Sequence, residues 1–349
     1  MLPCRVILGF LLAVVPSWTL TSPAEALPQA FVSVSGDDGD PNNPGNIEPI
    51  NPKPNCGPLA PCRTFARALE VVDEGGEVVA LSSGDYDRFT VRKRVSVVAA
   101  PGVHAVIGVP SGNGINVAVG GGGLVTLRGL TLHGLGGATG INVVAVDVLH
   151  VEDCVLNGFT GNAITFGVAI GQLHLRDTTV TNSGSDFASA VFIAGGFVSI
   201  NRLRMDHNRH GVVVDGGTVT IRDSVSEWQT EEAVWARGLN GAVDLTIENC
   251  TFMGPGTGAR GGITAGDPAG SRGVRMSVSN STVMNYPAGI LADQAPGTNT
   301  KVWVSNTIII VNSNAIVSSG GAAILSRGNN MVEDNTPGND TFTGGFSAK

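Results

Sequence analysis

The residue types best suited to chemistry gather between residues 186 and 237. Asp215, Arg237, His210 and Glu231 supply carboxylates, a cation and an imidazole within this stretch. Proton abstraction needs a tuned base, and glycoside hydrolysis needs two carboxylates. We therefore name these four residues as candidate catalytic groups.

Aromatic rings accompany these charges. An aromatic face beside an acid, a base and a cation suits a sugar polymer, so we assign substrate binding to Trp235, Phe192, Trp228 and His207. Exposed turns also collect charge without any function, and that is the competing interpretation. The turns around these residues carry Asp186, Arg209, Glu227 and Glu232 as well.

Two further sets of side chains could hold a metal ion. His150 and His174 fall at equivalent repeat positions, but two ligands on a flat strand make a poor site. The segment from Asp37 to Asn43 offers oxygen ligands for calcium, although it lacks the glycine and final glutamate of an EF-hand loop. We predict no metal site and no cofactor, and keep calcium at residues 37–43 as the alternative.

Composition and the amino-terminus limit the class of protein. The net charge of −8 argues against nucleic-acid binding. Val6 to Val15 is an apolar stretch too short to span a bilayer, and Ala24-Glu25-Ala26 fits a signal-peptide cleavage site. We expect residues 1–26 to be a signal peptide, and the remaining chain to be secreted or periplasmic, monomeric and without a membrane span.

An eight-residue pattern recurs eight times along the chain. Its third position is apolar each time, and the alternation of apolar and polar residues within it is typical of strands. A second short strand follows each copy. Repeats of 21 to 31 residues leave no room for a crossover helix, and a propeller blade needs about 40 residues. The third positions are Leu127, Val151, Leu175, Ile200, Ile221, Ile247, Val278 and Val304.

These spacings predict an all-β fold, a right-handed single-stranded parallel β-helix whose coils stack at roughly 4.8 Å. The position two residues later carries mostly Asp and Asn, which we expect to bond the backbone of the next coil. Cys154 and Cys250 share a column four coils apart, roughly 19 Å, so they should be free and buried. Cys56 and Cys62 bracket a Pro-rich loop and should form a disulfide after export.

The amino-terminal part of the chain should cap the stack. Residues 64–73 read as a short amphipathic helix, followed by a strand from Gly75 to Leu81 and then Gly84-Asp85-Tyr86. A polar-faced helix protects the open edge of a stacked sheet. We therefore divide the chain into the signal peptide, an amino-terminal extension at 27–62, and a β-helix at 63–345 that includes the capping helix.

This amino-terminal pattern resembles the cap of pectin-lyase-like right-handed β-helix proteins. The segment Pro61-Cys62-Arg63-Thr64-Phe65 and the turns at Asn280, Asn306 and Gly328 are similar to bacterial exported β-helix repeat proteins of unknown role. The resemblance implies the fold and a family of polysaccharide lyases, hydrolases and epimerases. Their motifs are missing: we find no Gly-His-Gly of polygalacturonases, no Trp-x-Asp-His of pectate lyases and no Asp-Pro-His-Asp of alginate epimerases.

Two functions therefore stay open. The first is an exported protein that binds a polysaccharide or cell-surface glycan, or acts on it as a lyase, hydrolase or epimerase if it is catalytic. The second is a non-catalytic structural or surface-interaction solenoid, similar to an adhesin. Fold alone does not decide between them. A focused site at residues 186–237 favours the first, and evenly spread polar positions favour the second.

Overall fold

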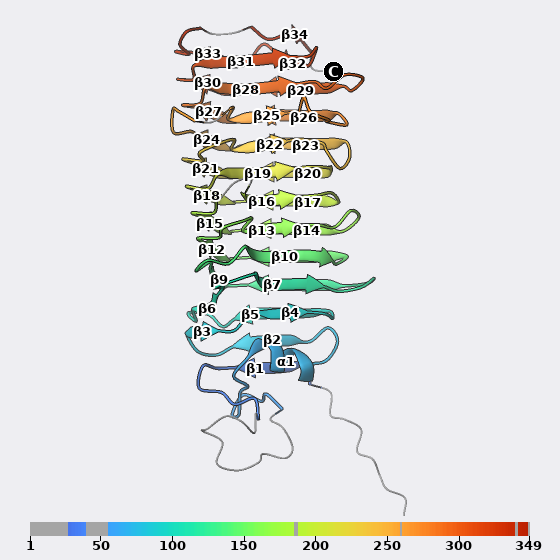
Figure 1. Ribbon diagram of the computed structural model, residues 1–349, viewed down its shortest axis with the longest axis vertical. Coiled ribbons are helices and arrows are strands. Elements are labelled where there is room, and N and C mark those ends of the chain that lie inside the picture. The colour runs from blue at the N-terminus through green and yellow to red at the C-terminus, as the bar shows by residue number, and fades with distance from the viewer. Residues whose placement is uncertain (1–26, 40–54, 185–187, 259, 339–340, 348–349) are drawn as a thin grey trace, which may run out of the picture.

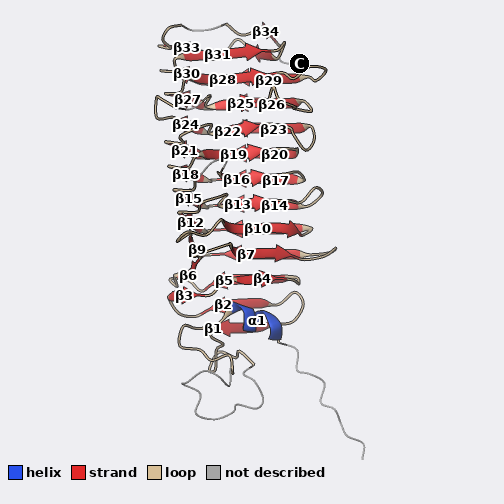
Figure 2. Ribbon diagram, in the orientation of Figure 1, coloured by secondary structure: helices blue, strands red, loops and turns tan. Residues whose placement is uncertain are grey.

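The computed structural model describes residues 27–39, 55–184, 188–258, 260–338 and 341–347. They form one stack of coils, and the strands of all three sheets pair in parallel (Figure 1). A complete coil gives one strand to each sheet, and the sheets run along the whole stack (Figure 2). The predicted parallel β-helix is confirmed.

The largest sheet has 13 strands and holds the predicted apolar column. Register pairs its members coil by coil, as in Leu127 with Val151 and Val151 with Leu175. Its strands are β1 (Gln29–Val32), β2 (Glu77–Ala80), β5 (Val95–Ala99), β8 (Leu124–Arg128), β11 (Val148–Glu152), β14 (Gln172–Arg176), β17 (Phe197–Asn201), β20 (Gly217–Arg222), β23 (Val243–Glu248), β26 (Val274–Ser279), β29 (Thr300–Ser305), β32 (Ala323–Ser326) and β34 (Gly344–Gly345).

The second sheet has 11 short strands, each of which follows a strand of the first sheet after a sharp bend. They are β3 (Gly84–Tyr86), β6 (Ala105–Gly108), β9 (Leu130–His133), β12 (Val155–Asn157), β15 (Thr179–Thr181), β18 (Arg204–Asp206), β21 (Val225–Glu227), β24 (Thr251–Met253), β27 (Thr282–Met284), β30 (Ile308–Ile310) and β33 (Met331–Glu333).

The third sheet has 10 strands and carries most of the candidate site. They are β4 (Phe89–Val91), β7 (Asn113–Ala118), β10 (Thr139–Ala145), β13 (Ile164–Phe166), β16 (Ser189–Ile193), β19 (His210–Val214), β22 (Val234–Ala236), β25 (Ile263–Ala265), β28 (Ala288–Asp293) and β31 (Asn314–Ser319).

The eight-residue repeat contains two strands rather than one. A residue with positive φ separates them in each copy, for example Asp153 (52°) and Asn249 (54°). Asp and Asn tolerate this left-handed conformation better than most residues. The turn column therefore marks a bend that sends the chain from the 13-strand sheet into the 11-strand sheet.

We predicted that side chains in this turn column bond the backbone of the next coil. In the structure they bond each other instead. Asn249 Nδ2 donates to Asp223 Oδ1 at 2.6 Å, and the next coil is reached by main-chain amides such as Asp223 N to Glu248 O, 3.2 Å. Side chains do bond the backbone of a neighbouring coil one position later in this turn, where Ser281 Oγ accepts from Cys250 N at 3.1 Å, and at the other turn, before the 10-strand sheet. There Asn208 Oδ1 accepts from Ser183 N at 2.9 Å.

A column of glycine and alanine lies at the beginning of the strands of the 10-strand sheet. A Cβ added at Gly211 would lie 2.2 Å from the carbonyl oxygen of Ala233, and one at Gly289 would lie 2.7 Å from that of Ala315. Because the next coil approaches so closely, larger residues do not fit. The column is Gly114, Gly140, Ala163, Ala190, Gly211, Ala233, Gly262, Gly289 and Ala315.

The amino-terminal end is closed by α1 (Phe65–Val71), the helix among the described residues. Thr64 Oγ1 accepts from Arg67 N at 3.1 Å and caps it. Asp38 binds this start: its Oδ1 accepts from Thr64 N at 3.1 Å, and its Oδ2 accepts from Thr64 Oγ1 at 2.6 Å. Both oxygens of Asp38, one of the possible calcium ligands, are thus engaged by protein donors.

The sheet begins earlier than the helix. β1 lies in the segment assigned to an extension, yet it pairs with β2 as the first strand of the 13-strand sheet. Cys56 and Cys62 are disulfide-bonded beside it, with Cα atoms 4.7 Å apart. The expected signal peptide, residues 1–26, lies outside the described residues. No helix in the described ranges is long and apolar enough to cross a membrane.

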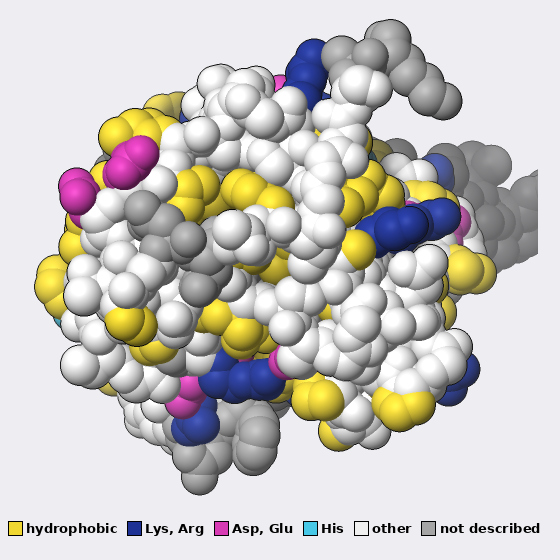
Figure 3. All heavy atoms as spheres, turned by 90° about the horizontal axis from the view of Figure 1, so that it is seen from above, with side chains coloured by type: hydrophobic (Ala, Val, Ile, Leu, Met, Phe, Trp, Pro, Cys, Tyr) yellow, Lys and Arg dark blue, Asp and Glu magenta, His cyan; other side chains and the backbone are white. Residues whose placement is uncertain are grey.

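The opposite end has no covering helix among the described residues. Its outermost strands are β31, β33 and β34. Figure 3 looks onto this end, where hydrophobic side chains reach the surface and charged side chains lie toward the periphery. The stack is therefore protected differently at its two ends.

Cys154 and Cys250 are free and buried, as the column predicted. Each thiol donates to the carbonyl two residues earlier, at 3.2 Å to Glu152 and 3.3 Å to Glu248. Hydroxyls do the same in other coils, as Ser224 does to Arg222 at 2.7 Å. The cysteines thus occupy a column of small hydrogen-bond donors.

We expect Gly211→Ala to destabilise the fold by about 1–3 kcal/mol, because the new methyl meets a backbone carbonyl that packing holds in place. Gly241→Ala is the matched control, since a Cβ there meets nothing within 4 Å. Denaturant midpoints measure both. Equal midpoints for the two variants would contradict the close approach.

We expect both free thiols to resist alkylation at pH 8 in the native protein. Burial raises the pKa of Cys154 to about 12 and that of Cys250 to about 11, so the reactive thiolate is scarce at this pH. Mass spectrometry after iodoacetamide treatment should show two modified residues only in denaturant. A peptide that links residues 154 and 250 would contradict the register.

Candidate functional site

The outer face of the 10-strand sheet brings together five of the eight predicted site residues. Register places Phe192, Val213 and Trp235 in one outward column on successive coils, and the column continues through Thr264 to Leu291. Asp215 and Arg237 follow two residues later on neighbouring coils, as predicted. We call this region the central patch: Phe192, His210, Asp215, Glu232, Trp235 and Arg237.

Asp215 and Arg237 form a two-pronged ion pair. Arg237 Nε donates to Asp215 Oδ1 at 2.6 Å, and Nη2 donates to Oδ2 at 2.7 Å. The two side chains are 6% and 19% exposed. Because both carboxylate oxygens are occupied, Asp215 is placed to hold the guanidinium and not to exchange protons. Its part in the site is therefore to position Arg237.

Arg237 and Trp235 stack against each other. The guanidinium carbon lies 5.1 Å from the Trp235 ring centroid and 5.8 Å from that of Phe192. Arg260 lies 5.9 Å from the same tryptophan ring and pairs with Asp293 at 2.7 Å. Cations over an aromatic face are attracted to it. Trp235 is thus bordered by two arginines, each already paired with an acid.

Arg260 was not anticipated from the sequence. It lies in the long connection between β24 and β25, where the repeat pattern is interrupted and no column can be assigned. The only sequence signal is the extra length of that repeat. It indicates an insertion but does not predict which coil the inserted residues contact.

His210 and Glu232 form a buried pair at the edge of the patch. His210 Nδ1 lies 2.9 Å from Glu232 Oε2, and the two side chains are 6% and 1% exposed. The His210 ring centroid lies 5.6 Å from that of Trp235. A carboxylate on one ring nitrogen orients an imidazole for proton transfer at the other.

The catalytic assignment of Glu231 does not fit this geometry. Its carboxylate lies 3.8 Å from Arg209, whereas its neighbour Glu232 contacts His210. Glu232 Oε1 is buried and has no hydrogen-bond partner among the described residues. Glu231 and Glu232 are adjacent in this turn, and the conformation of the turn decides which of them contacts His210.

His207 and Trp228 form a separate exposed pair at the turn before the 10-strand sheet. Both have positive φ, 52° and 56°, which is rare for residues this large. Their rings stack with centroids 6.4 Å apart, and His207 Nδ1 lies 2.7 Å from Asp206 Oδ1. Trp228 is 44% exposed. The Trp228 ring is therefore accessible to solvent, whereas arginines border the ring of Trp235. Asp186, from the same predicted cluster, lies outside the described residues.

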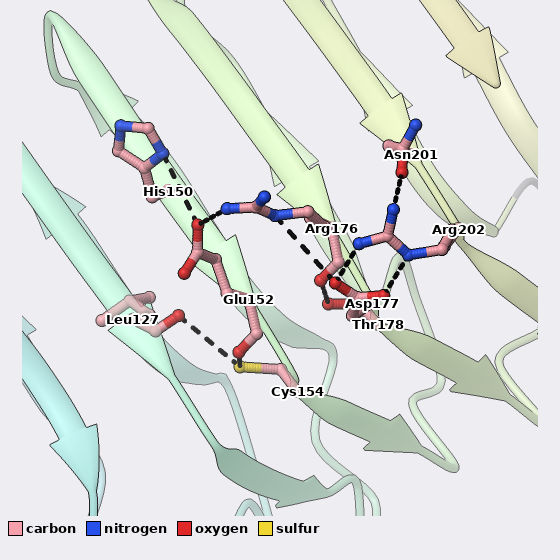
Figure 4. Close-up of polar contacts among 9 residues, drawn as sticks. All are labelled: Leu127, His150, Glu152, Cys154, Arg176, Asp177, Thr178, Asn201 and Arg202. Atoms are coloured by element: carbon pink, nitrogen blue, oxygen red, sulfur yellow. Dashed lines mark hydrogen bonds and ion pairs between the residues drawn. The ribbon is translucent and has the colours of Figure 1, made fainter. Parts of the chain in front are cut away.

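The outer face of the 13-strand sheet carries a different polar arrangement (Figure 4). Glu152 pairs with Arg176 at 2.8 Å, and Asp177 pairs with Arg202 at 2.5 Å. The Arg202 hydrogen bond lowers the pKa of Asp177. The first pair lies on the strands and the second in the turn column beside them, so two adjacent columns hold ion pairs between successive coils.

His150 and His174 stack beside these ion pairs, with ring centroids 4.8 Å apart. They line a shallow hollow of about 430 Å³ together with the paired ions. Partial burial, and then the charge of His150, lower the pKa of His174. Among the described residues no three His, Cys, Asp or Glu side chains are grouped to hold a metal ion.

Comparison with known proteins bears on the fold alone. No family model matches the chain, and no curated protein matches it. A crystal structure of pectate lyase Pel9A is similar, with a TM-score of 0.55 and 12% sequence identity over 90% of this chain and 79% of the lyase. The parallel β-helix that the resemblance implied is confirmed, and the likeness to this lyase concerns the fold alone.

We expect Asp215→Ala to cost about 3–5 kcal/mol of stability, because it leaves Arg237 mostly buried without its counter-charge. Asp244→Ala is the matched control. Asp244 binds Arg275 through the same two-pronged geometry, 2.5 and 2.6 Å, but both side chains are exposed. That change should cost less than about 1 kcal/mol. Thermal unfolding of the two variants measures the difference, and equal losses would contradict a buried role for Asp215.

Proposed function

We propose that this protein is exported, secreted or periplasmic, and that it binds a polysaccharide along the outer face of the 10-strand sheet. The observation that supports this most is the central patch, where an aromatic ring, an oriented cation and a buried imidazole–carboxylate pair adjoin on successive coils. A sugar polymer presents apolar ring faces and hydroxyls at short intervals, and such a patch offers partners for both.

In this proposal His210 is the group that exchanges a proton with the polymer, and Glu232 orients it. The 2.9 Å contact uses Nδ1, which leaves Nε2 for the substrate. Arg237, held by Asp215, supplies positive charge beside it for an oxygen that becomes more negative during reaction. The reaction would be elimination, hydrolysis or epimerisation.

A non-catalytic solenoid is the second candidate, and one observation favours it. Ions on the outer face of the 13-strand sheet and in the turn column beside it pair between successive coils, as Glu152–Arg176 and Asp177–Arg202 do. Such a face supports stacking and solubility without focusing on any ligand. Under this alternative the protein presents its outer faces to a surface partner and leaves glycans unchanged.

A polysaccharide panel tests the binding proposal. Phe192→Thr removes a ring of the central patch and introduces a residue that the same column already holds at Thr165 and Thr264, so it should keep stability and weaken polymer binding by about tenfold, through loss of stacking on the sugar. Trp303→Thr, in the outward column of the 13-strand sheet, is the control and should bind as the native protein does. Isothermal titration measures both. If no polymer binds the native protein, the polysaccharide proposal is lost.

The same panel tests catalysis through unsaturated products, reducing ends and altered sugar composition. His210→Asn should abolish any turnover while leaving polymer affinity within about threefold, because a proton-transferring group stabilises the reaction and not the bound state. Native protein that binds a polymer and never changes it would favour the non-catalytic candidate.

A further inference from the structure

We propose that the outer face of the last coils of the 11-strand sheet docks an amphipathic helix of another protein, one that carries Lys or Arg beside its apolar side. This inference goes beyond the proposed function, because it concerns a different sheet and stands under either candidate function. It begins from a group of outward apolar side chains. We call this group the apolar face: Met253, Met284, Ile308, Ile310, Val311 and Met331.

Register holds the apolar face together across four neighbouring strands, β24, β27, β30 and β33 (Figure 1). Met253 pairs with Met284, and Met284 pairs with Ile310, in one outward column. Ile308 pairs with Met331 in the outward column beside it. The apolar side chains therefore adjoin one another from coil to coil.

The apolar face is a local feature of this sheet. At the equivalent outward positions β18 carries Arg204 and Asp206. Trp228 adjoins the face, since its amide donates to the carbonyl oxygen of Met253 at 2.9 Å. Contiguous exposed apolar groups mark interaction sites, whereas scattered ones need no explanation. Beyond residue 200, the large apolar side chains that are exposed among the described residues all lie on this face or beside it: Trp228 (44%), Ile308 (37%), Val311 (55%) and Met331 (52%).

The backbone at Val311 also points to a use for its side chain. Val311 has a φ of 58°, in the left-handed region that β-branched residues avoid. The same turn position holds Asn285 (62°) in the preceding coil and Asp334 (55°) in the following one. Both of these residue types tolerate the left-handed conformation. The chain thus presents an outward valine where its backbone favours asparagine, and such outliers gather at functional sites.

Acidic side chains border the carboxy-terminal end of the apolar face. Glu333 and Asp334 are exposed, and among the described residues neither forms an ion pair. Asp334 also lines a hollow of about 170 Å³ beside Val311. Arg327, in the turn before β33, supplies one positive charge against these two negative charges. A partner with Lys or Arg beside its apolar side would therefore meet complementary charge.

The dimensions of the apolar face suit one helix better than a second copy of this chain. Four coil steps separate Trp228 from Met331, roughly 19 Å, and the three residues from Ile308 to Val311 span about 10 Å. A stable dimer buries about 800 Å² on each partner, and these dimensions give roughly 200 Å². An α-helix is about 10 Å wide and covers 19 Å with about 13 residues. Methionine side chains adapt to the shape of what they contact.

The test uses three labelled synthetic peptides of about 14 residues, long enough to cover the face as a helix. One has Leu along one side of the helix and Lys elsewhere. The second replaces each Lys by Glu, and the third scrambles the Leu/Lys sequence. By fluorescence anisotropy, the full chain should bind the first peptide about tenfold more tightly than either other peptide at low salt. Its preference over the acidic peptide should shrink as salt is added.

The variant Ile308→Thr/Val311→Asn/Met331→Thr should weaken binding of the Leu/Lys peptide by about tenfold, because it removes apolar surface that the helix would cover. It should stay folded, since Thr282 already lies in the same column and Asn285 at the same turn position. If circular dichroism shows misfolding, Val311→Asn alone replaces it and should weaken binding by about threefold. The matched control removes three exposed apolar side chains elsewhere and should bind as the native protein does: Leu124→Thr/Ile170→Thr/Phe197→Thr.

A second variant tests the charge of the partner. Glu333→Gln/Asp334→Asn leaves the apolar face in place and should weaken binding of the Leu/Lys peptide by about threefold at low salt, with no loss at high salt. Asparagine also suits the positive φ at position 334. Unchanged binding by this variant would overturn the assignment of a basic partner.

Equal binding of the three peptides, or binding of none, would overturn the inference. An equal loss in the control variant would do the same, because it would attribute binding to apolar surface anywhere on the chain. Analytical ultracentrifugation covers the remaining occupant. A native dimer that the triple variant at residues 308–331 converts to a monomer would assign the face to a second copy and overturn the proposed partner. Polysaccharide binding is measured separately, so none of these outcomes decides the proposed function.

Discussion

The structure depends on one constraint, the close contact of each coil with the next. Main-chain amides bond across this contact, and side chains at equivalent positions must fit against each other at the strand spacing. The glycine and alanine column shows the steric side of the constraint, since a Cβ at Gly211 would meet the carbonyl of Ala233. The ion pairs show the electrostatic side, since a charged side chain lies about one strand spacing from the residue at the same position of the next coil, as Asp244 does from Arg275. Within the candidate site, Asp215 and Arg237 satisfy each other across this contact.

Much of the fold is readable from sequence because stacking repeats the same environment. The apolar third positions identified one column, and that column predicted the free cysteines and the neighbouring positions of Asp215 and Arg237. Departures from the prediction occur outside the repeated strands, at the amino-terminus and at the turns. β1 lacks the repeat pattern because it precedes the helix. The turn side chains were expected to bond backbone, but their left-handed bend directs them toward one another.

The candidate site was predictable to a similar extent, for the same reason. Phe192, Trp235 and Arg237 lie in strands, so their alignment followed from the repeat. The sequence predicted Glu231 where the structure has Glu232, because the conformation of a turn decides which of two adjacent glutamates contacts His210. Arg260 comes from an insertion with no counterpart in other coils. Residues that give a repeat protein its individual chemistry often come from such irregular connections, where periodicity carries no information.

Register connects Thr90 to Trp235 along the outward column of the 10-strand sheet, and the path between them has a consequence for how such proteins diversify. Distance along this sheet is set by the number of coils between two points, because each coil adds one strand spacing. Duplication or loss of a single repeat between these residues would lengthen or shorten the path by one step and leave the residues at either end unchanged. A change in the number of repeats can therefore alter the distance between two sites on this surface without any substitution in the sites themselves.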